Sequence, residues 1–210
     1  GPASAMVNPT VWSDGSGRGD RARGPIDDIG FIQAVLDDVA RRAAVDPARV
    51  YLVGHSSGAG MTFHAAADFG RRLAAAAAVA GHWWTPRVTL ASLSFLHLVG
   101  DQDPLAPLNG GFARNPWGPP QSMPALGEST INWANAIGCP PPRAERREAI
   151  SITAWAGCRD GAEVQFWVIH GHGHGWAGGP NRLPAALTGP HLNRPDATAL
   201  IWDFFRAHRR

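Results

Sequence analysis

The sequence contains no lysine, so arginine supplies all of its basic side chains apart from histidine. These 19 basic residues are nearly balanced by 17 acidic ones, and the formal net charge is only +2. The arginines are scattered along the chain, whereas nucleic-acid-binding proteins usually concentrate basic side chains on one face. The absence of a basic stripe therefore argues against a nucleic-acid partner.

Long apolar runs are also lacking. The alanine-rich stretch 73–80 is far shorter than the roughly 18 to 20 residues that cross a bilayer, so no membrane span is expected. The first residues show no basic segment followed by an apolar one, and we expect no secretory signal peptide in the printed chain. With 210 residues, of which 44% are hydrophobic and 17% charged, the chain is predicted to form one globular domain.

Only two cysteines are present, Cys139 and Cys158. Both follow a glycine, and they flank a segment rich in proline and arginine. This spacing is one that a loop-closing disulfide can span. Two unrelated buried thiols are the alternative.

The pattern of apolar residues predicts an α/β fold. Residues 1–24 are rich in glycine, proline and serine and are expected to form an irregular N-terminal segment, followed by a single domain over 25–210. The expected helices are 27–45, 58–69, 130–137 and 197–208, and the expected strands are 50–53, 75–79, 93–99, 150–154 and 164–169. Their alternation predicts a mostly parallel sheet flanked by helices.

A G-x-S-x-G pattern, Gly54-His55-Ser56-Ser57-Gly58, lies between a predicted strand and a predicted helix. Glycines at these positions allow a sharp, strained turn that exposes the serine hydroxyl. Ser56 is therefore a candidate nucleophile. The backbone N–H of Ser57, at the start of the helix, is a candidate donor to a tetrahedral oxyanion.

A serine nucleophile needs a base and an orienting carboxylate, and both types of residue follow later strands. Asp101 and Asp103 come after strand 93–99, and three histidines at positions 170, 172 and 174 come after strand 164–169. The order Ser, Asp, His is that of the α/β-hydrolases. The three alternating histidines leave a metal site open as an alternative.

Several motifs together resemble those of the extracellular polyhydroxybutyrate depolymerase-like esterases, a family that also includes feruloyl and acetyl xylan esterases. They are Trp12-x-Asp14-Gly15, Asp27-Asp28-Ile29-Gly30-Phe31-Ile32, Asp46-Pro47-x-Arg49-Val50-Tyr51, the pattern at 54–58, Gly100-x-x-Asp103-Pro104-x-x-Pro107-x-x-Gly110-Gly111, Trp133-x-x-x-x-Gly138-Cys139, Gly157-Cys158 and Gly173-His174-x-Trp176-x-Gly178-Gly179. The resemblance implies an α/β-hydrolase fold for 25–210, with Asp103 as the acid and His174 as the base. It also implies a disulfide between Cys139 and Cys158 and a secreted or periplasmic protein.

The sequence departs from this family at its amino end. Nothing before Trp12 matches the family's earlier strands, or the His-Gly loop that supplies a second oxyanion donor. Without those strands, strand 50–53 is expected at an exposed sheet edge, which makes a homodimer through this edge possible.

Nine tryptophans are present, and Trp83, Trp84, Trp117 and Trp176 are predicted on loops near the candidate catalytic residues. Trp83, Trp84 and Trp176 are candidate substrate contacts, and His55 is expected either to be structural or to flank the pocket as a further substrate contact. Ordinary packing is the alternative for Trp83 and Trp84.

The sequence therefore predicts a serine esterase that works through an acyl-serine intermediate without a metal or organic cofactor. The expected substrate is a polymeric ester: first a polyester of the polyhydroxyalkanoate type, then a feruloylated or acetylated polysaccharide. A catalytically impaired relative that binds a polymer or glycan is the main alternative, and a metal-dependent hydrolase is the third.

Overall fold

The computed structural model describes residues 11–17, 26–87, 91–113, 120–181 and 183–210. The helices are α2 (Asp28–Arg42), α3 (Ser57–Phe69), α4 (Leu126–Ala136), α5 (Ala185–Thr188) and α6 (Ala197–Arg206), with short 3-10 turns η2 (Gly70–Arg72) and η3 (Arg159–Gly161). The strands are β1 (Tyr51–His55), β2 (Ala75–Val79), β3 (Ser94–Gly100), β4 (Gly111–Ala113), β5 (Gln121–Met123), β6 (Arg143–Arg147), β7 (Ile150–Trp155) and β8 (Val164–Ile169). Of the predicted irregular segment 1–24, only residues 11–17 are described, and they form neither helix nor strand.

The main sheet has six strands in the order β1-β2-β3-β8-β7-β6. The pairs β1–β2, β2–β3 and β3–β8 are parallel, whereas β7 and β6 run antiparallel to their neighbours. The predicted α/β fold with a mostly parallel sheet is confirmed. Residue His55 is opposite Val79, and Gly100 is opposite Ile169, so the parallel strands end at the same edge of the sheet.

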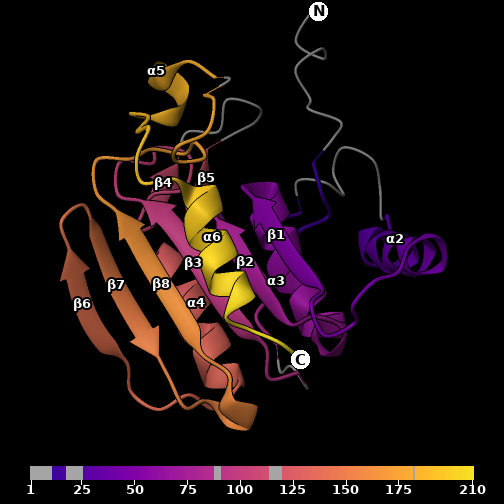
Figure 1. Cartoon of the computed structure of the whole chain (residues 1–210). Helices are drawn as coiled ribbons and strands as arrows, with labels where there is room; N and C mark the ends of the chain where they lie inside the picture. The colour runs from indigo at the N-terminus through magenta and orange to yellow at the C-terminus, as the bar shows by residue number, and fades with distance from the viewer. Residues whose placement is uncertain (1–10, 18–25, 88–90, 114–119, 182) are drawn as a thin grey trace, which may run out of the picture.

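Helices cover both faces of this sheet (Figure 1). Helices α3 and α4 pack on one face and α6 on the other, each over its own apolar cluster. Strand β2 consists of four alanines and a valine, all buried. Because these side chains are short, they leave room for large side chains from the helices, such as Phe63 of α3 and Phe205 of α6.

Strand β1 forms one edge of the sheet, as the sequence predicts. The side chain of Val53 on this strand is 43% exposed. Nearby α2 also presents Phe31, Val35 and Val39 to solvent. Within the described parts of the chain, no helix combines the length and the apolarity needed to cross a bilayer.

The hairpin of β6 and β7 was not predicted as such. Strand β6 has the sequence RAERR and is exposed along its whole length, so it lacks the apolar alternation that would predict a strand. It forms because its backbone pairs with β7 across a short turn. The short strands β4 and β5, which pair with each other, also lack an apolar alternation that would predict strands.

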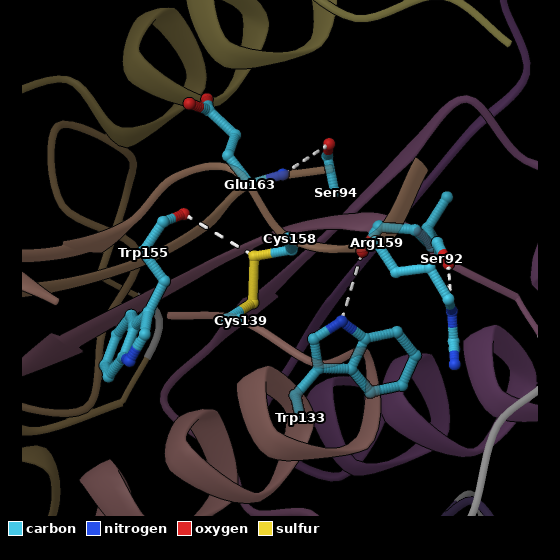
Figure 2. The surroundings of a disulfide bond; sticks show 9 residues. Ser92, Ser94, Trp133, Cys139, Trp155, Cys158, Arg159 and Glu163 are labelled. Carbon is cyan, nitrogen blue, oxygen red and sulfur yellow. Dashed lines mark hydrogen bonds between the residues drawn. A yellow bond between two sulfur atoms is a disulfide. The ribbon is translucent and has the colours of Figure 1, made fainter. Parts of the chain in front are cut away.

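A disulfide joins Cys139 to Cys158, as the resemblance implied. It links the segment after α4 to η3 and closes a loop that contains the β6–β7 hairpin (Figure 2). Beside it, Trp133 Nε1 donates a hydrogen bond to the carbonyl oxygen of Leu93, and Arg159 Nε donates one to Ser92 Oγ. The disulfide loop is therefore tied to the chain that leads into β3.

Candidate active site

Ser56 lies on the turn between β1 and α3, with a positive φ of 58°. For a residue with a side chain this backbone conformation is strained. The turn is held by hydrogen bonds from the Ser56 N–H to the Val79 carbonyl (2.8 Å) and from the Ala59 N–H to the Ser56 carbonyl (3.0 Å). A Cβ at Gly54 would collide with the carbonyl oxygen of Gly58, which explains why the first glycine of the motif is needed.

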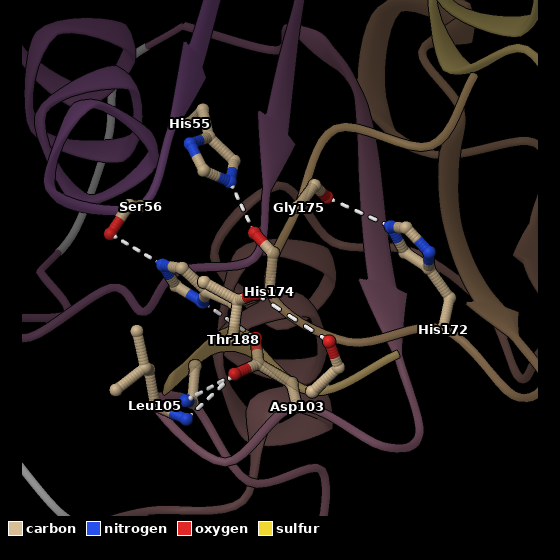
Figure 3. Close-up of polar contacts among 10 residues, drawn as sticks. His55, Ser56, Asp103, Leu105, His172, His174, Gly175 and Thr188 are labelled. Atoms are coloured by element: carbon tan, nitrogen blue, oxygen red, sulfur yellow. Dashed lines mark hydrogen bonds and ion pairs between the residues drawn. The ribbon is translucent and has the colours of Figure 1, made fainter. Parts of the chain in front are cut away.

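The imidazole of His174 lies between Ser56 and Asp103 (Figure 3). Its Nδ1 is 2.7 Å from Asp103 Oδ2, and its Nε2 is 2.8 Å from Ser56 Oγ. Donation from Nδ1–H to the carboxylate leaves Nε2 of the neutral ring as the acceptor for the serine hydroxyl. The structure thus brings together the three residues that the sequence predicted as nucleophile, acid and base.

Asp103 is held by the turn that follows β3. Its Oδ1 accepts hydrogen bonds from the N–H groups of Leu105 and Ala106, both at 2.8 Å. The residue is only 4% exposed. With one oxygen fixed by the backbone, the other points at His174, and the carboxylate can hold the imidazole in a single orientation.

Asp101 and His170 form a separate pair. His170 Nδ1 donates to Asp101 Oδ2 at 2.8 Å, and the Gly171 N–H donates to Asp101 Oδ1 at 2.7 Å. Although burial acts to raise the pKa of Asp101, these hydrogen bonds lower it below its usual range. On the other side of the ring, His170 Nε2 lies 2.8 Å from Ser151 Oγ. Sequence reasoning did not single out Ser151.

His172 is buried, and among the described residues both of its ring nitrogens bond to backbone groups. Its Nε2 donates to the Gly175 carbonyl (2.9 Å), and its Nδ1 accepts from the Leu192 N–H (3.2 Å). Burial is the main reason that its pKa lies below the usual value. The three alternating histidines thus have different partners, and the described residues contain no cluster of three or more His, Cys, Asp or Glu suited to a metal ion.

His55 supports the base from the other side. Its Nε2 donates a hydrogen bond to the His174 carbonyl oxygen at 2.6 Å. Burial, together with the neighbouring His174 ring, lowers the pKa of His55 to about 4. The ring is therefore neutral near pH 7, the state in which one of its nitrogens carries a hydrogen and the other does not.

The candidate aromatic contacts separate into buried and accessible groups. Trp83 is 2% exposed and packs against Phe63 and Trp133. It is therefore a core residue rather than a direct substrate contact. Trp84 and Trp176 are half-buried. The Trp176 ring lies edge-on to His55, with centroids 6.3 Å apart. Trp117 lies outside the described residues.

Ser57 is the first residue of α3, directly after the turn that carries Ser56. Its backbone N–H therefore lies at the N-terminal end of a helix, where N–H groups have no intrahelical acceptor. Such a group next to the serine can donate to an oxyanion that forms on a bound acyl group.

Comparison with known proteins identifies relatives of the chain. No family model matches it. It is 30% identical over 200 residues to NocK of Nocardia uniformis subsp. tsuyamanensis, a provisionally named esterase, covering 85% of this chain and 57% of NocK. It is 27% identical over 157 residues to feruloyl esterase B of Piromyces equi, covering 70% of this chain and 29% of that protein.

A solved structure also matches. The crystal structure of a thermostable esterase superposes with a TM-score of 0.55 at 14% identity, covering 96% of this chain and 42% of that one. The sheet order, the strained serine turn and this match define an α/β-hydrolase fold. Both sequence relatives are named as esterases, and the chain spans 57% or less of the length of each.

Proposed function

We propose that this protein is a serine esterase that hydrolyses carboxylic esters through an acyl-serine intermediate. The observation that carries the proposal is the hydrogen-bonded array of Ser56, His174 and Asp103, with distances of 2.8 and 2.7 Å. A serine hydroxyl is a weak nucleophile until a base accepts its proton. Similarity to two proteins named as esterases supports the same reaction class.

In the first half-reaction, Ser56 Oγ attacks the ester carbonyl carbon while its proton passes to His174 Nε2. The Ser57 N–H donates to the oxygen that gains negative charge, and Asp103 stabilises the imidazolium. The tetrahedral intermediate then collapses. The C–O bond to the alcohol breaks, and His174 returns the proton to the departing alcohol.

In the second half-reaction, water replaces the alcohol. His174 accepts a proton from the water as its oxygen attacks the acyl-serine, and the same Ser57 N–H stabilises the second tetrahedral intermediate. Its collapse releases the carboxylic acid and returns the proton to Ser56. No metal or organic cofactor takes part in this scheme.

For the substrate, we propose a polyester of the polyhydroxyalkanoate type or a feruloyl or acetyl ester of a polysaccharide. Trp84, Trp176 and the edge of His55 are the proposed contacts, because they are partly accessible and aromatic. Similarity to feruloyl esterase B favours the phenolic ester. Rates on 3-hydroxybutyrate oligomers, methyl ferulate and acetylated xylan, measured side by side, would separate these classes.

Secretion or residence in the periplasm is the proposed location. The disulfide between Cys139 and Cys158 supports it, because disulfides persist mainly in oxidising compartments.

We also propose that two copies can associate through β1. Among the described residues, no strand pairs with the outer side of β1, and Val53 on this strand is 43% exposed, so this edge can pair with another chain. Light scattering during size-exclusion chromatography tests the idea. A dimer that becomes a monomer in Val53→Lys would support it, and a monomeric parent at high concentration would overturn it.

The decisive experiment is hydrolysis of p-nitrophenyl butyrate by the parent and by Ser56→Ala, each shown to be folded by circular dichroism. Turnover that falls at least about 10⁴-fold in the variant supports the serine mechanism. A folded parent without turnover would favour a polymer- or glycan-binding relative. Activity that chelators abolish would favour a metal-dependent hydrolase.

A further inference from the structure

A second Ser–His–Asp array lies at the carboxyl end of the sheet, beside the first. Ser151 Oγ is 2.8 Å from His170 Nε2, and His170 Nδ1 is 2.8 Å from Asp101 Oδ2. The corresponding distances in the first array are 2.8 and 2.7 Å. The order of groups is also the same: the carboxylate accepts from Nδ1, and Nε2 is left to accept from the hydroxyl.

The second array is more accessible than the first. The side chains of His170 and Asp101 are 31% and 22% exposed, whereas those of His174 and Asp103 are 9% and 0% exposed. Ser151 itself is half-buried on β7. Reagents in solution can therefore reach a serine that has a positioned base.

A basic residue lies opposite this serine on the neighbouring strand. Arg146 on β6 is directly opposite Ser151 in the antiparallel pair of strands. Residues that are opposite each other in such a pair project from the same face, with Cβ atoms about 5 Å apart. Arg146 is exposed and forms no ion pair with any residue in the described ranges. Its guanidinium can thus stabilise negative charge that develops on a group attached to Ser151.

The surroundings of Ser151 differ from those of Ser56 in one respect. Ser151 lies within a regular strand that is bonded on both sides, to β6 and to β8. Its neighbouring backbone N–H groups are used in the sheet, so they cannot form an oxyanion hole like the one expected at Ser57. Rapid deacylation is therefore not expected there.

We propose that Ser151 is a second activated serine, which accepts an acyl or phosphoryl group from a reactive donor and retains it. With a fluorophosphate, the Ser151 O–P bond forms, the P–F bond breaks and fluoride leaves. With an activated ester, the acyl group moves to Ser151 and the alcohol leaves. In both cases the serine proton passes first to His170 Nε2, while Asp101 stabilises the imidazolium. With the fluorophosphate the proton is then released to solvent, and with the ester His170 passes it to the oxygen of the departing alcohol. This second reactivity is independent of Ser56.

The test uses Ser56→Ala, which removes the first nucleophile. The folded variant is incubated with diisopropyl fluorophosphate and followed by intact-protein mass spectrometry. We expect one added diisopropylphosphoryl group, which peptide sequencing by mass spectrometry locates on Ser151. No added mass on the folded variant, or a label on another residue, would overturn the proposal.

Further variants in the Ser56→Ala background separate activation from simple exposure. His170→Gln should slow labelling about 100-fold, since a positioned base typically contributes about 10² to 10⁴. Ser122→Ala removes an exposed serine on β5 and should leave the rate unchanged. A labelling rate that is the same with and without His170 would mean that the array is only a structural link between β7, β8 and β3.

Discussion

His55 Nε2 donates a hydrogen bond to the backbone carbonyl of His174 over 2.6 Å (Figure 3). The residue directly before the candidate nucleophile thus holds the loop that carries the candidate base. Because the base must stay within hydrogen-bonding distance of Ser56, this contact connects two segments that are 119 positions apart.

We predict that His55→Ala lowers kcat on p-nitrophenyl butyrate about tenfold to 100-fold, because small displacements of a catalytic group are costly. His55→Gln, which keeps a donor, should recover part of the rate. His64→Ala is the control, since that ring bonds to Thr85. Equal activity of parent and His55→Ala would show that the base loop does not need this contact.

The two carboxylates after β3 should differ strongly in their effect. Asp103→Asn puts an amide beside His174 and favours the wrong ring tautomer, so we expect kcat to fall about 10³- to 10⁴-fold. Asp101→Asn should leave most of the turnover, because Asp101 binds His170 and the Gly171 N–H. Steady-state kinetics of both variants make the comparison. A larger loss for Asp101→Asn would reverse the assignment.

The histidines at positions 172 and 174 provide a second matched pair. His174→Ala should remove nearly all turnover. His172→Ala loses bonds to Gly175 and Leu192, so it should lower stability by about 1 to 3 kcal/mol but leave most of the activity of the folded protein. Kinetics and urea unfolding of both variants check this. Equal losses of activity would contradict the assignment.

The disulfide should stabilise the fold mainly by restricting the unfolded chain. Its cysteines are 19 positions apart, for which the loop-entropy relation gives about 3 kcal/mol. We therefore expect a Cys139→Ala, Cys158→Ala double variant to unfold at lower urea concentration than the oxidised parent. A reducing agent should lower the parent to the same value. An unchanged midpoint would mean that the bond does not stabilise the protein.

Acid should destabilise the protein through its buried histidines. Burial lowers the pKa of His97 to about 3, whereas the same ring in the unfolded chain titrates near 6.5. Between these values the unfolded state binds one more proton, so stability is lost as the pH falls, by up to about 1.4 kcal/mol per pH unit. His55 adds a similar contribution between about 6.5 and 4.

The variant His97→Gln lacks this ionisable ring, so its unfolded state does not take up the extra proton. Its free energy of unfolding should depend less on pH than that of the parent between pH 6 and 4, with a slope lower by about 1.4 kcal/mol per pH unit. His97 binds Thr130 Oγ1, so the variant should also be less stable at pH 7. Urea unfolding at several pH values measures both effects. An identical slope for parent and variant would exclude His97 as the source.

Some elements followed directly from local sequence. The strands 75–79 and 164–169 were predicted with the bounds that the structure gives them, because both appear in the sequence as short, mainly apolar runs. Strand β6 was missed, since its pairing with β7 and not its own side chains stabilises it. For Trp83 the sequence left both a substrate contact and ordinary packing open, because a loop position says nothing about burial; the structure buries it.

The candidate site also has features that local sequence predicts and features that it does not. The sequence by itself determined the serine turn and the nearby aspartates and histidines, because the glycines of 54–58 and the polar residues after two strands are local patterns. The local pattern left the choice between the two aspartates open, and the family resemblance implied Asp103 and His174. The tertiary structure shows Asp103 bonded to His174, and it alone shows Asp101 bonded to His170 and, through it, to Ser151. Two carboxylates two residues apart differ in their partners only through the directions in which the folded loops point them, and those directions depend on contacts between segments far apart in the chain.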